Sequence, residues 1–288
     1  MAKIGTKSEI NRQMKSNDFR TKKKFGQNFL VDQNILAKIV ESSSITSESL
    51  VIEIGPGMGS LTEHIMRKAK HVLAYEIDKE LMPILEKNFQ EGNITLINDD
   101  FLKRSIDKDI DSLEMSFDKV AIIANLPYYI TTPIIFKALE ESKYVEEMLV
   151  MMQLEVARRL TSKPKTKDYN ALSVVIQYKT KPSIALKVPR TVFIPVPNVD
   201  SAVVKLIVDN NREHKPSDEV RFFQLVKGSF KQRRKTLTNN LHEKYKIEKS
   251  VIIDILQNKG YDKNVRAEAL TVEDFITLSD VFTTYLSR

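Results

Sequence analysis

The sequence predicts a large α/β domain with a mostly parallel sheet, followed by a small all-helical domain. From residue 50 onward, short apolar segments alternate with segments of helical periodicity, which is typical of a parallel sheet covered by helices on both faces. Beyond about residue 220 the periodicity is helical to the end of the chain. A length of 288 residues fits one large domain or two unequal ones.

The first predicted helix begins at Asp32, a suitable N-cap, and it places Ile35, Leu36, Ile39 and Val40 on one face. Apolar strands are predicted at 50–54, 71–77, 93–97, 119–124, 147–152 and 201–208, and helices at 60–69, 78–89, 132–142, 220–230, 249–260 and 272–286. A segment with three prolines, 189–200, should be extended. The predicted organisation is a basic N-terminal arm (1–24), an α/β domain (25–208), a linker (209–219) and a helical domain (220–288).

The composition excludes several kinds of chemistry. Cysteine is absent, which excludes disulfides, a thiolate nucleophile and cysteine-ligated metals. The four histidines lack metal-ligand spacing, and there is no GxSxG nucleophile motif. No apolar run reaches the ~18 residues of a membrane span, and the N-terminus has no apolar stretch like that of a signal peptide. We therefore expect a cytoplasmic protein without a metal.

Positive charge is concentrated in two segments. Residues 1–24 hold eight Lys or Arg and two acidic residues, and residues 221–249 hold nine and two. The whole chain has a net charge of +7, so the remainder carries −6. Concentrated positive charge indicates a polyanion binder, although a solvated lysine-rich surface has the same composition. The candidate RNA-binding residues are Lys22, Lys23 and Lys24 in the arm, and Arg233, Arg234 and Lys235 in a segment (230–237) expected to be helical.

A glycine-rich loop, EIGPGMG (53–59), directly follows the first predicted strand. Glycines there let the backbone turn tightly and approach a ligand, but the spacing is neither GxGxxG nor that of a P-loop. Glu76 lies twenty-one residues past Gly55, at the end of the next strand, where a carboxylate can accept hydrogen bonds from both ribose hydroxyls. After the third strand, Asp100 could accept from an adenine amino group while Phe101 packs on the ring. These strand ends together predict a site for an adenosine-containing ligand.

The fourth strand ends in Asn125, Leu126, Pro127 and Tyr128. An exocyclic adenine amine is a poor nucleophile because its lone pair is delocalised into the ring. An amide oxygen and a backbone carbonyl that accept both of its N–H groups would favour the pyramidal nitrogen needed for attack. Proline holds the carbonyl rigidly, and a tyrosine beside it can stack on a base taken out of its helix or loop.

From about residue 20 to the end, the chain resembles the ribosomal RNA adenine-N6 dimethyltransferases. The resemblance rests on FGQNFL (25–30), the loop 53–59, NLPYYITTP (125–133), FIPVP (193–197) with VDSAV (199–203), and RRKTL (233–237). It implies a class I methyltransferase fold, with a seven-stranded sheet whose last strand is antiparallel. It also implies S-adenosylmethionine as methyl donor.

The family resemblance also implies roles for individual residues. Asn28 and Leu30 would close over the donor, and Gly55 would line its amino-acid end. Glu76 would bind the ribose of the donor, and Asp100 would bind its adenine. Asn125 would lie between the donor and the target adenosine, and Tyr128 would stack on the target base. The implied substrate is two adjacent adenosines in a hairpin loop near the 3′ end of 16S rRNA, within an immature 30S subunit. Both adenosines would become N6,N6-dimethylated by a monomeric enzyme.

Two alternatives share parts of this pattern. An antibiotic-resistance relative that acts on large-subunit rRNA has the same chemistry, but the YITTP and VDSAVV segments favour the small-subunit type. A non-catalytic assembly factor on the same scaffold would have no need of Glu76, Asn125, Pro127 and Tyr128, all of which are intact.

Overall fold

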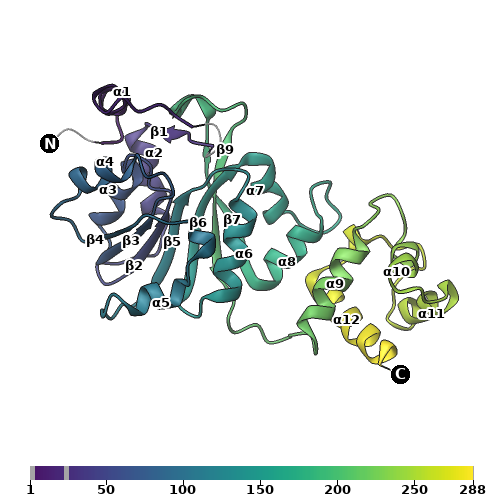
Figure 1. Cartoon of the computed structure of the whole chain (residues 1–288). Helices are drawn as coiled ribbons and strands as arrows, with labels where there is room; N and C mark the ends of the chain where they lie inside the picture. The colour runs from purple at the N-terminus through teal and green to yellow at the C-terminus, as the bar shows by residue number, and fades with distance from the viewer. Residues whose placement is uncertain (1–3, 23–25, 288) are drawn as a thin grey trace. The chain divides into compact units, whose positions relative to one another are not determined.

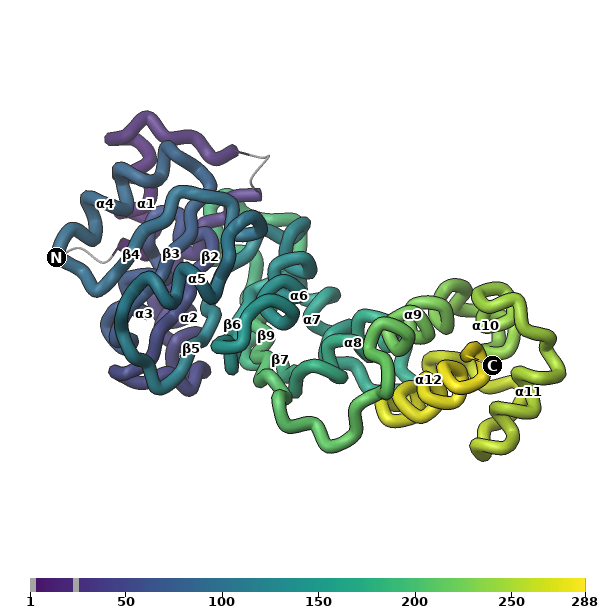
Figure 2. The backbone as a smooth tube through the Cα atoms, turned by 60° about the horizontal axis from the view of Figure 1, so that its bottom comes forward, coloured from purple at the N-terminus to yellow at the C-terminus, as the bar shows by residue number. Residues whose placement is uncertain are grey.

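The computed structural model describes residues 4–22 and 26–287, and the chain forms two units (Figures 1 and 2). The larger unit contains the chain up to Ala157 together with Ser183–Val208, and the smaller unit contains Arg158–Pro182 together with the chain from Asp209. Residues 158–182 lie within the predicted α/β domain, but their contacts group them with the C-terminal segment.

A seven-stranded sheet forms the core of the larger unit, in the order β4-β3-β2-β5-β6-β9-β7. Its strands are β2 (Leu50–Ile54), β3 (His71–Tyr75), β4 (Ile94–Ile97), β5 (Val120–Asn125), β6 (Val145–Gln153), β7 (Thr180–Val188) and β9 (Ser201–Val208). The first five pair in parallel, and β9 pairs antiparallel with β6. All six predicted strands are present, and β9 has the orientation that the family resemblance implied. The strand β7 had not been predicted.

Helices cover the sheet of the larger unit on both faces (Figure 1). The helices described in this unit are α1 (Lys7–Ser16), α2 (Gln33–Glu41), α3 (Ser60–Met66), α4 (Met82–Asn88), α5 (Ile106–Asp111) and α6 (Thr131–Glu141), and α7 (Leu154–Thr161) begins in it. The N-cap of α2 is Asp32, as predicted, and its side chain accepts hydrogen bonds from the N–H groups of Asn34 and Ile35. By contrast, α4 begins later than predicted, because Asp78 forms a turn in which its side chain accepts from Glu80 N.

The predicted basic arm is partly folded. Residues 7–16 form α1, whose N-cap is Thr6 and whose buried face carries Ile10 and Gln13. The side chain of Ile10 is fully buried in a cluster with Phe29 of β1 (Phe29–Leu30) and Met58 of the glycine loop. A periodicity of buried residues therefore makes this segment a packed helix, and not an extended arm. The predicted contacts of Lys23 and Lys24 lie outside the described residues.

The proline-rich segment is extended, as predicted, apart from one 3-10 turn, Arg190–Val192. Within it, β8 (Phe193–Ile194) pairs antiparallel with β1, and the Ile194–Pro195 peptide bond is cis. This pairing holds the residues just after the N-terminal arm, 29–30, against the residues before β9, 193–194.

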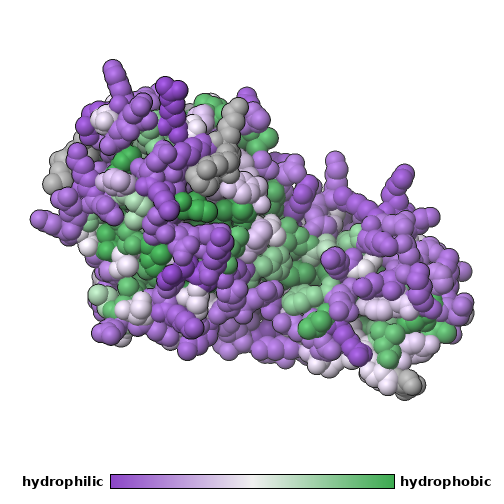
Figure 3. Space-filling model, viewed as in Figure 1, coloured by the Kyte–Doolittle hydropathy of each residue, from purple (hydrophilic) through white to green (hydrophobic). Residues whose placement is uncertain are grey.

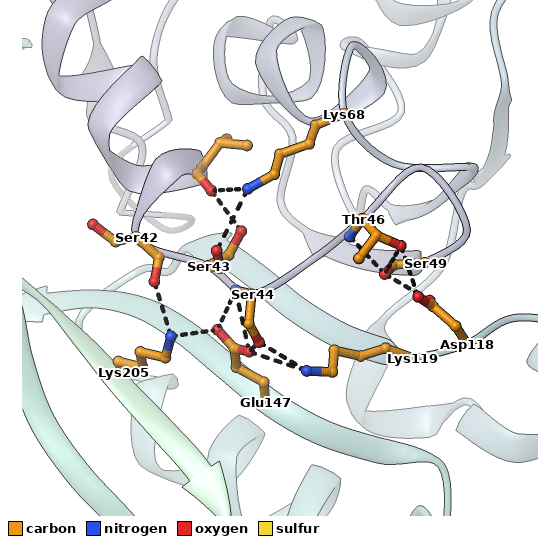
Figure 4. Close-up of polar contacts among 11 residues, drawn as sticks. Ser42, Ser43, Ser44, Thr46, Ser49, Lys68, Asp118, Lys119, Glu147 and Lys205 are labelled. Atoms are coloured by element: carbon orange, nitrogen blue, oxygen red, sulfur yellow. Dashed lines mark hydrogen bonds and ion pairs between the residues drawn. The ribbon is translucent and has the colours of Figure 1, made fainter.

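A buried carboxylate fixes the amino-terminal edge of the sheet (Figure 4). Glu147 of β6 accepts hydrogen bonds from the N–H and hydroxyl of Ser44, and Lys205 of β9 forms a salt bridge with it at 3.1 Å. Burial raises the pKa of Glu147, but these partners outweigh burial and hold it below its ordinary value. The cluster lies at the opposite ends of the strands from the glycine loop, so it stabilises the sheet away from the site described below.

The smaller unit is helical. It contains α8 (Ala171–Lys179), α9 (Glu219–Ser229), α10 (Leu237–Tyr245), α11 (Lys249–Asn258) and α12 (Val272–Leu286) around an apolar core that includes Phe222, Leu241 and Phe275. The three predicted C-terminal helices are confirmed, and α8 had not been predicted. Within the described part of the chain, no helix is both long and apolar enough to cross a membrane.

The basic segment 230–237 does not form the helix that was predicted. Residues 231–235 form a turn between α9 and α10, because Asn240 Nδ2 donates to the carbonyls of Ser229 and Gln232. Thr236 then begins α10 as its N-cap, accepting a hydrogen bond from Asn239 N.

Candidate active site

One pocket of the larger unit gathers the residues that the sequence analysis assigned to the donor and to catalysis. It lies where the strand order reverses, at the carboxyl ends of β2, β3 and β5, which is where ligands of such sheets bind. All ten of these predicted residues line it, namely Asn28, Leu30, Gly55, Glu76, Asp100, Phe101, Asn125, Leu126, Pro127 and Tyr128. Their individual roles remain predictions.

The glycine loop forms one wall of the pocket. Gly55 has a φ of +69°, a left-handed conformation that favours glycine, and its N–H donates to Tyr75 O at 2.8 Å. A Cβ at this position would meet no atom within 4 Å, so it would project into open space. At Gly57, by contrast, a Cβ would lie 2.9 Å from the ring of Phe29. Gly55 therefore leaves room for a ligand, whereas Gly57 permits close packing.

Two buried carboxyl groups line the pocket near this loop. Glu76 is 4% exposed, and it accepts hydrogen bonds from the N–H groups of Gly57 at 3.1 Å and Asp78 at 2.8 Å. Burial raises the pKa of Glu76 to about 7, against the effect of these N–H groups. Glu53 is 1% exposed, and burial raises its pKa to about 8. Its Oε2 has no hydrogen-bond partner among the described residues.

The third strand end contributes an aromatic and a carboxylate. Asp100 caps the 3-10 turn Phe101–Lys103, and its Oδ1 accepts from Leu102 N at 3.0 Å. The ring of Phe101 is buried and lies edge-on to Tyr75 at 5.2 Å between centroids. Both residues line the pocket, so the sequence pattern brought them to the expected wall.

Asn125 is held by the segment that follows the arm. Its Nδ2 donates to the carbonyl of Asn28 at 3.1 Å, which leaves Oδ1 of the same amide as an acceptor. Pro127 offers no N–H, and its carbonyl accepts from Ile130 N and from the Thr131 hydroxyl. The carbonyl of Pro127 is therefore already engaged within the turn.

Tyr128 is half-buried, and its hydroxyl shares a hydrogen bond of 2.8 Å with the hydroxyl of Ser201, a fully buried residue at the start of β9. Burial raises the pKa of Tyr128, so the phenol stays protonated at neutral pH. This bond holds the hydroxyl end of the ring in place beside the pocket. The next residue, Tyr129, is 61% exposed.

The surface of the larger unit is mostly hydrophilic, with apolar areas on the face drawn in Figure 3. The exposed large apolar side chains described in this unit are Ile77, Met115, Tyr129, Val196, Val199 and Ile207. Of these, Ile77 also lines the pocket, directly after Glu76.

The pocket residues suit S-adenosylmethionine. The buried carboxylate of Glu76 can accept from ribose hydroxyls, and apolar walls such as Ile77 and Phe101 suit an adenine ring. The unpartnered Oε2 of Glu53 can accept from an ammonium group, and the open space beside Gly55 admits a chain that carries one. Among the residues that the structure describes, no group of three or more His, Cys, Asp or Glu could hold a metal ion.

The predicted RNA-binding residues that the structure describes, Lys22, Arg233, Arg234 and Lys235, are not among those that line the pocket. Lys22 is engaged in salt bridges with Asp78 and Glu80 at 2.7 and 2.9 Å, so it is not a free cation of an arm. Arg233 donates to the carbonyl of Lys167 and lies 3.5 Å from Glu268. Arg234 and Lys235 are exposed, and neither side chain has a hydrogen bond or salt bridge to another described residue.

Three pocket-related residues were not assigned a role from the sequence. Ser201 lies in the VDSAV motif (199–203), but its partner in the hydrogen bond, Tyr128, is 73 residues away in the sequence. Gln27 and Asp78 are joined across 51 residues. Only one signal was available for Asp78, namely its position two residues after Glu76.

Comparison with known proteins identifies the family. A sequence model described as ribosomal RNA adenine dimethylase matches residues 18–284. The chain is 47% identical over 266 residues to the ribosomal RNA small subunit methyltransferase A of Bacillus thuringiensis (strain Al Hakam), with 91% of each chain covered.

Two solved structures are similar over most of the chain. A dimethyladenosine transferase from Plasmodium falciparum has a TM-score of 0.73 and 26% identity, covering 89% of this chain and 97% of its own. The 23S rRNA methyltransferase ErmE has a TM-score of 0.68 and 26% identity, covering 87% and 98%. The fold is therefore that of a class I methyltransferase with an added helical part. The match over nearly the whole chain shows that this protein belongs to the ribosomal RNA adenine dimethylase family.

Proposed function

We propose that this enzyme uses S-adenosylmethionine to dimethylate N6 of two adjacent adenosines in a hairpin loop near the 3′ end of small-subunit rRNA. The observation that carries the proposal is the position of Asn125. Its amide nitrogen is committed to the carbonyl of Asn28, which leaves its oxygen as an acceptor in the pocket that also contains Glu76 and Gly55. A donor cradle and an acceptor for an amine therefore share one cavity.

At the donor end of the pocket, Glu76 accepts hydrogen bonds from the ribose. Glu53 and the space beside Gly55 bind the amino-acid end of the donor. Asp100 and Phe101 bind its adenine. Asn28 and Leu30 lie across the same pocket and cover the donor. When bound, the donor supplies a methyl group on a sulfonium, which is already activated toward attack by an amine.

The transfer end holds the target amine. Asn125 Oδ1 and the Leu126 carbonyl accept its two N–H groups, which favours the pyramidal nitrogen that attacks. Pro127 fixes the direction of the Leu126 carbonyl because its ring restricts the backbone. Holding the amine in line with the methyl group can lower the barrier by up to about 7–11 kcal/mol for ideally oriented partners. The proton that the amine loses after transfer passes to water.

Tyr128 stacks on the target base after the base has left its RNA loop. Extrusion of a base costs a few kcal/mol, less in a loop than in a duplex. Stacking on an aromatic ring returns about 1–3 kcal/mol. The bond to Ser201 supports this role, since a ring that is already fixed loses little freedom when the base stacks on it.

The small-subunit rRNA is favoured over the large-subunit rRNA as substrate. Relatives named for the small subunit are 47% identical, whereas the similar 23S rRNA methyltransferase is 26% identical. We further propose that the protein acts as a monomer on an immature 30S subunit, in which the loop near the 3′ end is still accessible.

The test is to map the modified nucleotides. Small subunits from a strain that lacks this modification are incubated with the protein and a methyl-labelled donor, and the rRNA fragments are analysed by mass spectrometry. Two adjacent N6,N6-dimethyladenosines near the 3′ end are expected. Label confined to large-subunit rRNA, offered in a parallel reaction, would contradict the substrate assignment. The absence of label in both would contradict the activity.

A further inference from the structure

A buried carboxylate beside the pocket joins two segments that are far apart in the sequence. Asp78 is 2% exposed. Its Oδ1 accepts from Lys22 Nζ at 2.7 Å, and its Oδ2 accepts from Gln27 Nε2 at 2.8 Å. The side-chain carbonyl of Gln27 in turn accepts from the backbone N–H of Lys22 at 2.7 Å. Lys22 and Gln27 are therefore both bound to the same carboxylate.

The same residue reaches the donor end of the pocket through its backbone. The N–H of Asp78 donates to Glu76 Oε1 at 2.8 Å, which orients the carboxylate assigned to the ribose. Asp78 itself does not line the pocket, whereas Gln27 and Glu76 do. It can therefore act on the site only through these neighbours.

The residues around Gln27, from 26 to 28, also reach the transfer end. Gln27 is followed by Asn28, whose carbonyl accepts from Asn125 Nδ2 at 3.1 Å. Gly26 lies against the NLPY turn, since a Cβ there would be 3.3 Å from Pro127 Cβ. A displacement of this segment would remove the partner of the Asn125 amide and open one wall of the pocket.

We propose that Asp78 is a positioning residue that holds Gln27 and Asn28 at the pocket and so couples the donor carboxylate, Glu76, to the acceptor amide, Asn125. The proposal rests on the proposed function for the meaning of these two ends. Its physical basis is the cost of burying a charge. A buried carboxylate with too few partners is strongly unfavourable, so Asp78 remains in place only while Lys22 and Gln27 are bound to it.

The charge state agrees with this geometry. Burial raises the pKa of Asp78, but the hydrogen bonds from Lys22 and Gln27 outweigh it and hold the pKa below its ordinary value. The carboxylate is thus ionised at neutral pH, and both of its oxygens require donors.

An exchange of donor and acceptor provides the test. In Gln27→Glu, two carboxylates would face each other, and in Asp78→Asn, one side-chain oxygen would remain for two donors, Lys22 Nζ and Gln27 Nε2. In the double variant, the amide introduced at position 78 would donate to the carboxylate introduced at position 27, and Lys22 would keep an acceptor at both positions. The hydrogen-bond pattern would be restored with the negative charge moved by one side chain. Glu80→Gln is the matched control, since Glu80 also pairs with Lys22 but is 63% exposed.

Amide hydrogen exchange of residues 26–30 is measured on the protein without donor, together with the affinity for S-adenosylhomocysteine by calorimetry. Each single variant should exchange at least about tenfold faster in this segment and bind the analogue about tenfold more weakly, as expected for loss of a charge-assisted hydrogen bond. The double variant should recover both, and Glu80→Gln should match wild type. A far-ultraviolet spectrum and an unfolding midpoint confirm that each variant is folded.

Unchanged exchange in both single variants would overturn the proposal, and so would a double variant no better than the worse single one. These outcomes are independent of the proposed function, because exchange without donor does not depend on what the enzyme methylates. A failure to find dimethyladenosine with normal exchange behaviour would instead contradict the substrate and leave the positioning role standing.

Discussion

At the scale of single residues, the raised pKa of Glu76 should make donor binding sensitive to pH. In the proposed assignment the ionised carboxylate accepts from the ribose, and burial raises its pKa to about 7. Affinity for S-adenosylhomocysteine should therefore be highest above pH 7 and fall as the pH drops through this value, by at most about tenfold per pH unit. Calorimetry from pH 8.5 to 6 measures this dependence.

Two variants separate the carboxyl groups of the pocket in this experiment. Glu76→Gln should lose the pH dependence centred near pH 7 and weaken binding by about 1.5–3 kcal/mol, the value of a hydrogen bond to a charged group. Glu53→Gln should keep that dependence and lose only a contribution centred near pH 8, because burial raises the pKa of Glu53 to about 8. A Glu76→Gln variant with wild-type affinity would refute the ribose assignment.

The bond between Tyr128 and Ser201 allows the ring and the hydroxyl to be tested separately. Tyr128→Phe keeps the ring and loses one hydrogen bond, so methyl transfer should fall only by the roughly 2–10-fold that about 0.5–1.5 kcal/mol represents. Ser201→Ala should have the same effect, and the double variant should add nothing further because both changes remove one interaction. Tyr128→Ala should be much slower. A folded but inactive Tyr128→Phe would show that the hydroxyl has a role in the reaction itself.

Eight of the ten residues assigned to the pocket could be predicted because they lie at or just after the ends of buried strands, and parallel strands end at one edge. The other two, Asn28 and Leu30, were implied only by the family resemblance. Asp78 and Ser201 could not, since their contribution depends on partners 51 and 73 residues away. A polar residue near a motif gives no sign, in a single sequence, of which distant side chain it will bind.

At the scale of elements, periodicity predicted the strands of the parallel sheet and the C-terminal helices, because each has a continuous buried face. Periodicity failed where hydrogen bonds from a side chain outweigh the helical preference of the local sequence. The segment 230–237 has helical composition, but the side chain of Asn240 binds the carbonyls of Ser229 and Gln232 and forms a turn there. The prediction of a basic arm rested on its charge alone, so it missed the helix α1 and its buried residues Ile10 and Gln13.

The packing of α1 against the glycine loop predicts a role for this helix in donor binding. Ile10 is fully buried beside Met58, so Ile10→Ala should cost about 2–5 kcal/mol of stability, or unfold the helix alone. In either case, affinity for S-adenosylhomocysteine should fall because the loop loses its support. Asn11→Ala, on the exposed face, is the control. The measurements are chemical denaturation and calorimetry, and a destabilised Ile10→Ala with wild-type affinity would refute the link.

At the scale of the whole molecule, the net charge is +7, and the Lys and Arg residues are concentrated in two segments. Some of these side chains pair with other residues, whereas others are exposed and available to bind phosphate. Lys22 and Arg233 are bound to other residues, whereas Arg234 and Lys235 are exposed on the turn before α10. Phosphate contacts act through counterion release. Arg234→Ala with Lys235→Ala should therefore weaken RNA binding and flatten the dependence of log K on log salt by about 0.7–0.9 per lost contact.

Filter binding at several salt concentrations measures this slope, and donor affinity serves as the control because these residues lie outside the pocket. A double variant with the wild-type slope would mean that this turn is merely solvated.

The central claim is that Asn125 Oδ1 accepts from the target amine, and single-turnover methyl transfer by Asn125→Ala tests it most directly. The accepted hydrogen bond strengthens as the nitrogen becomes pyramidal, so its loss falls on the transition state more than on the ground state. With saturating donor and RNA, the rate should fall by about 10²–10³, the usual cost of removing one preorganised polar partner. The affinity for S-adenosylhomocysteine is measured alongside, because the variant also loses the bond to Asn28. A single-turnover rate near that of wild type would contradict the account.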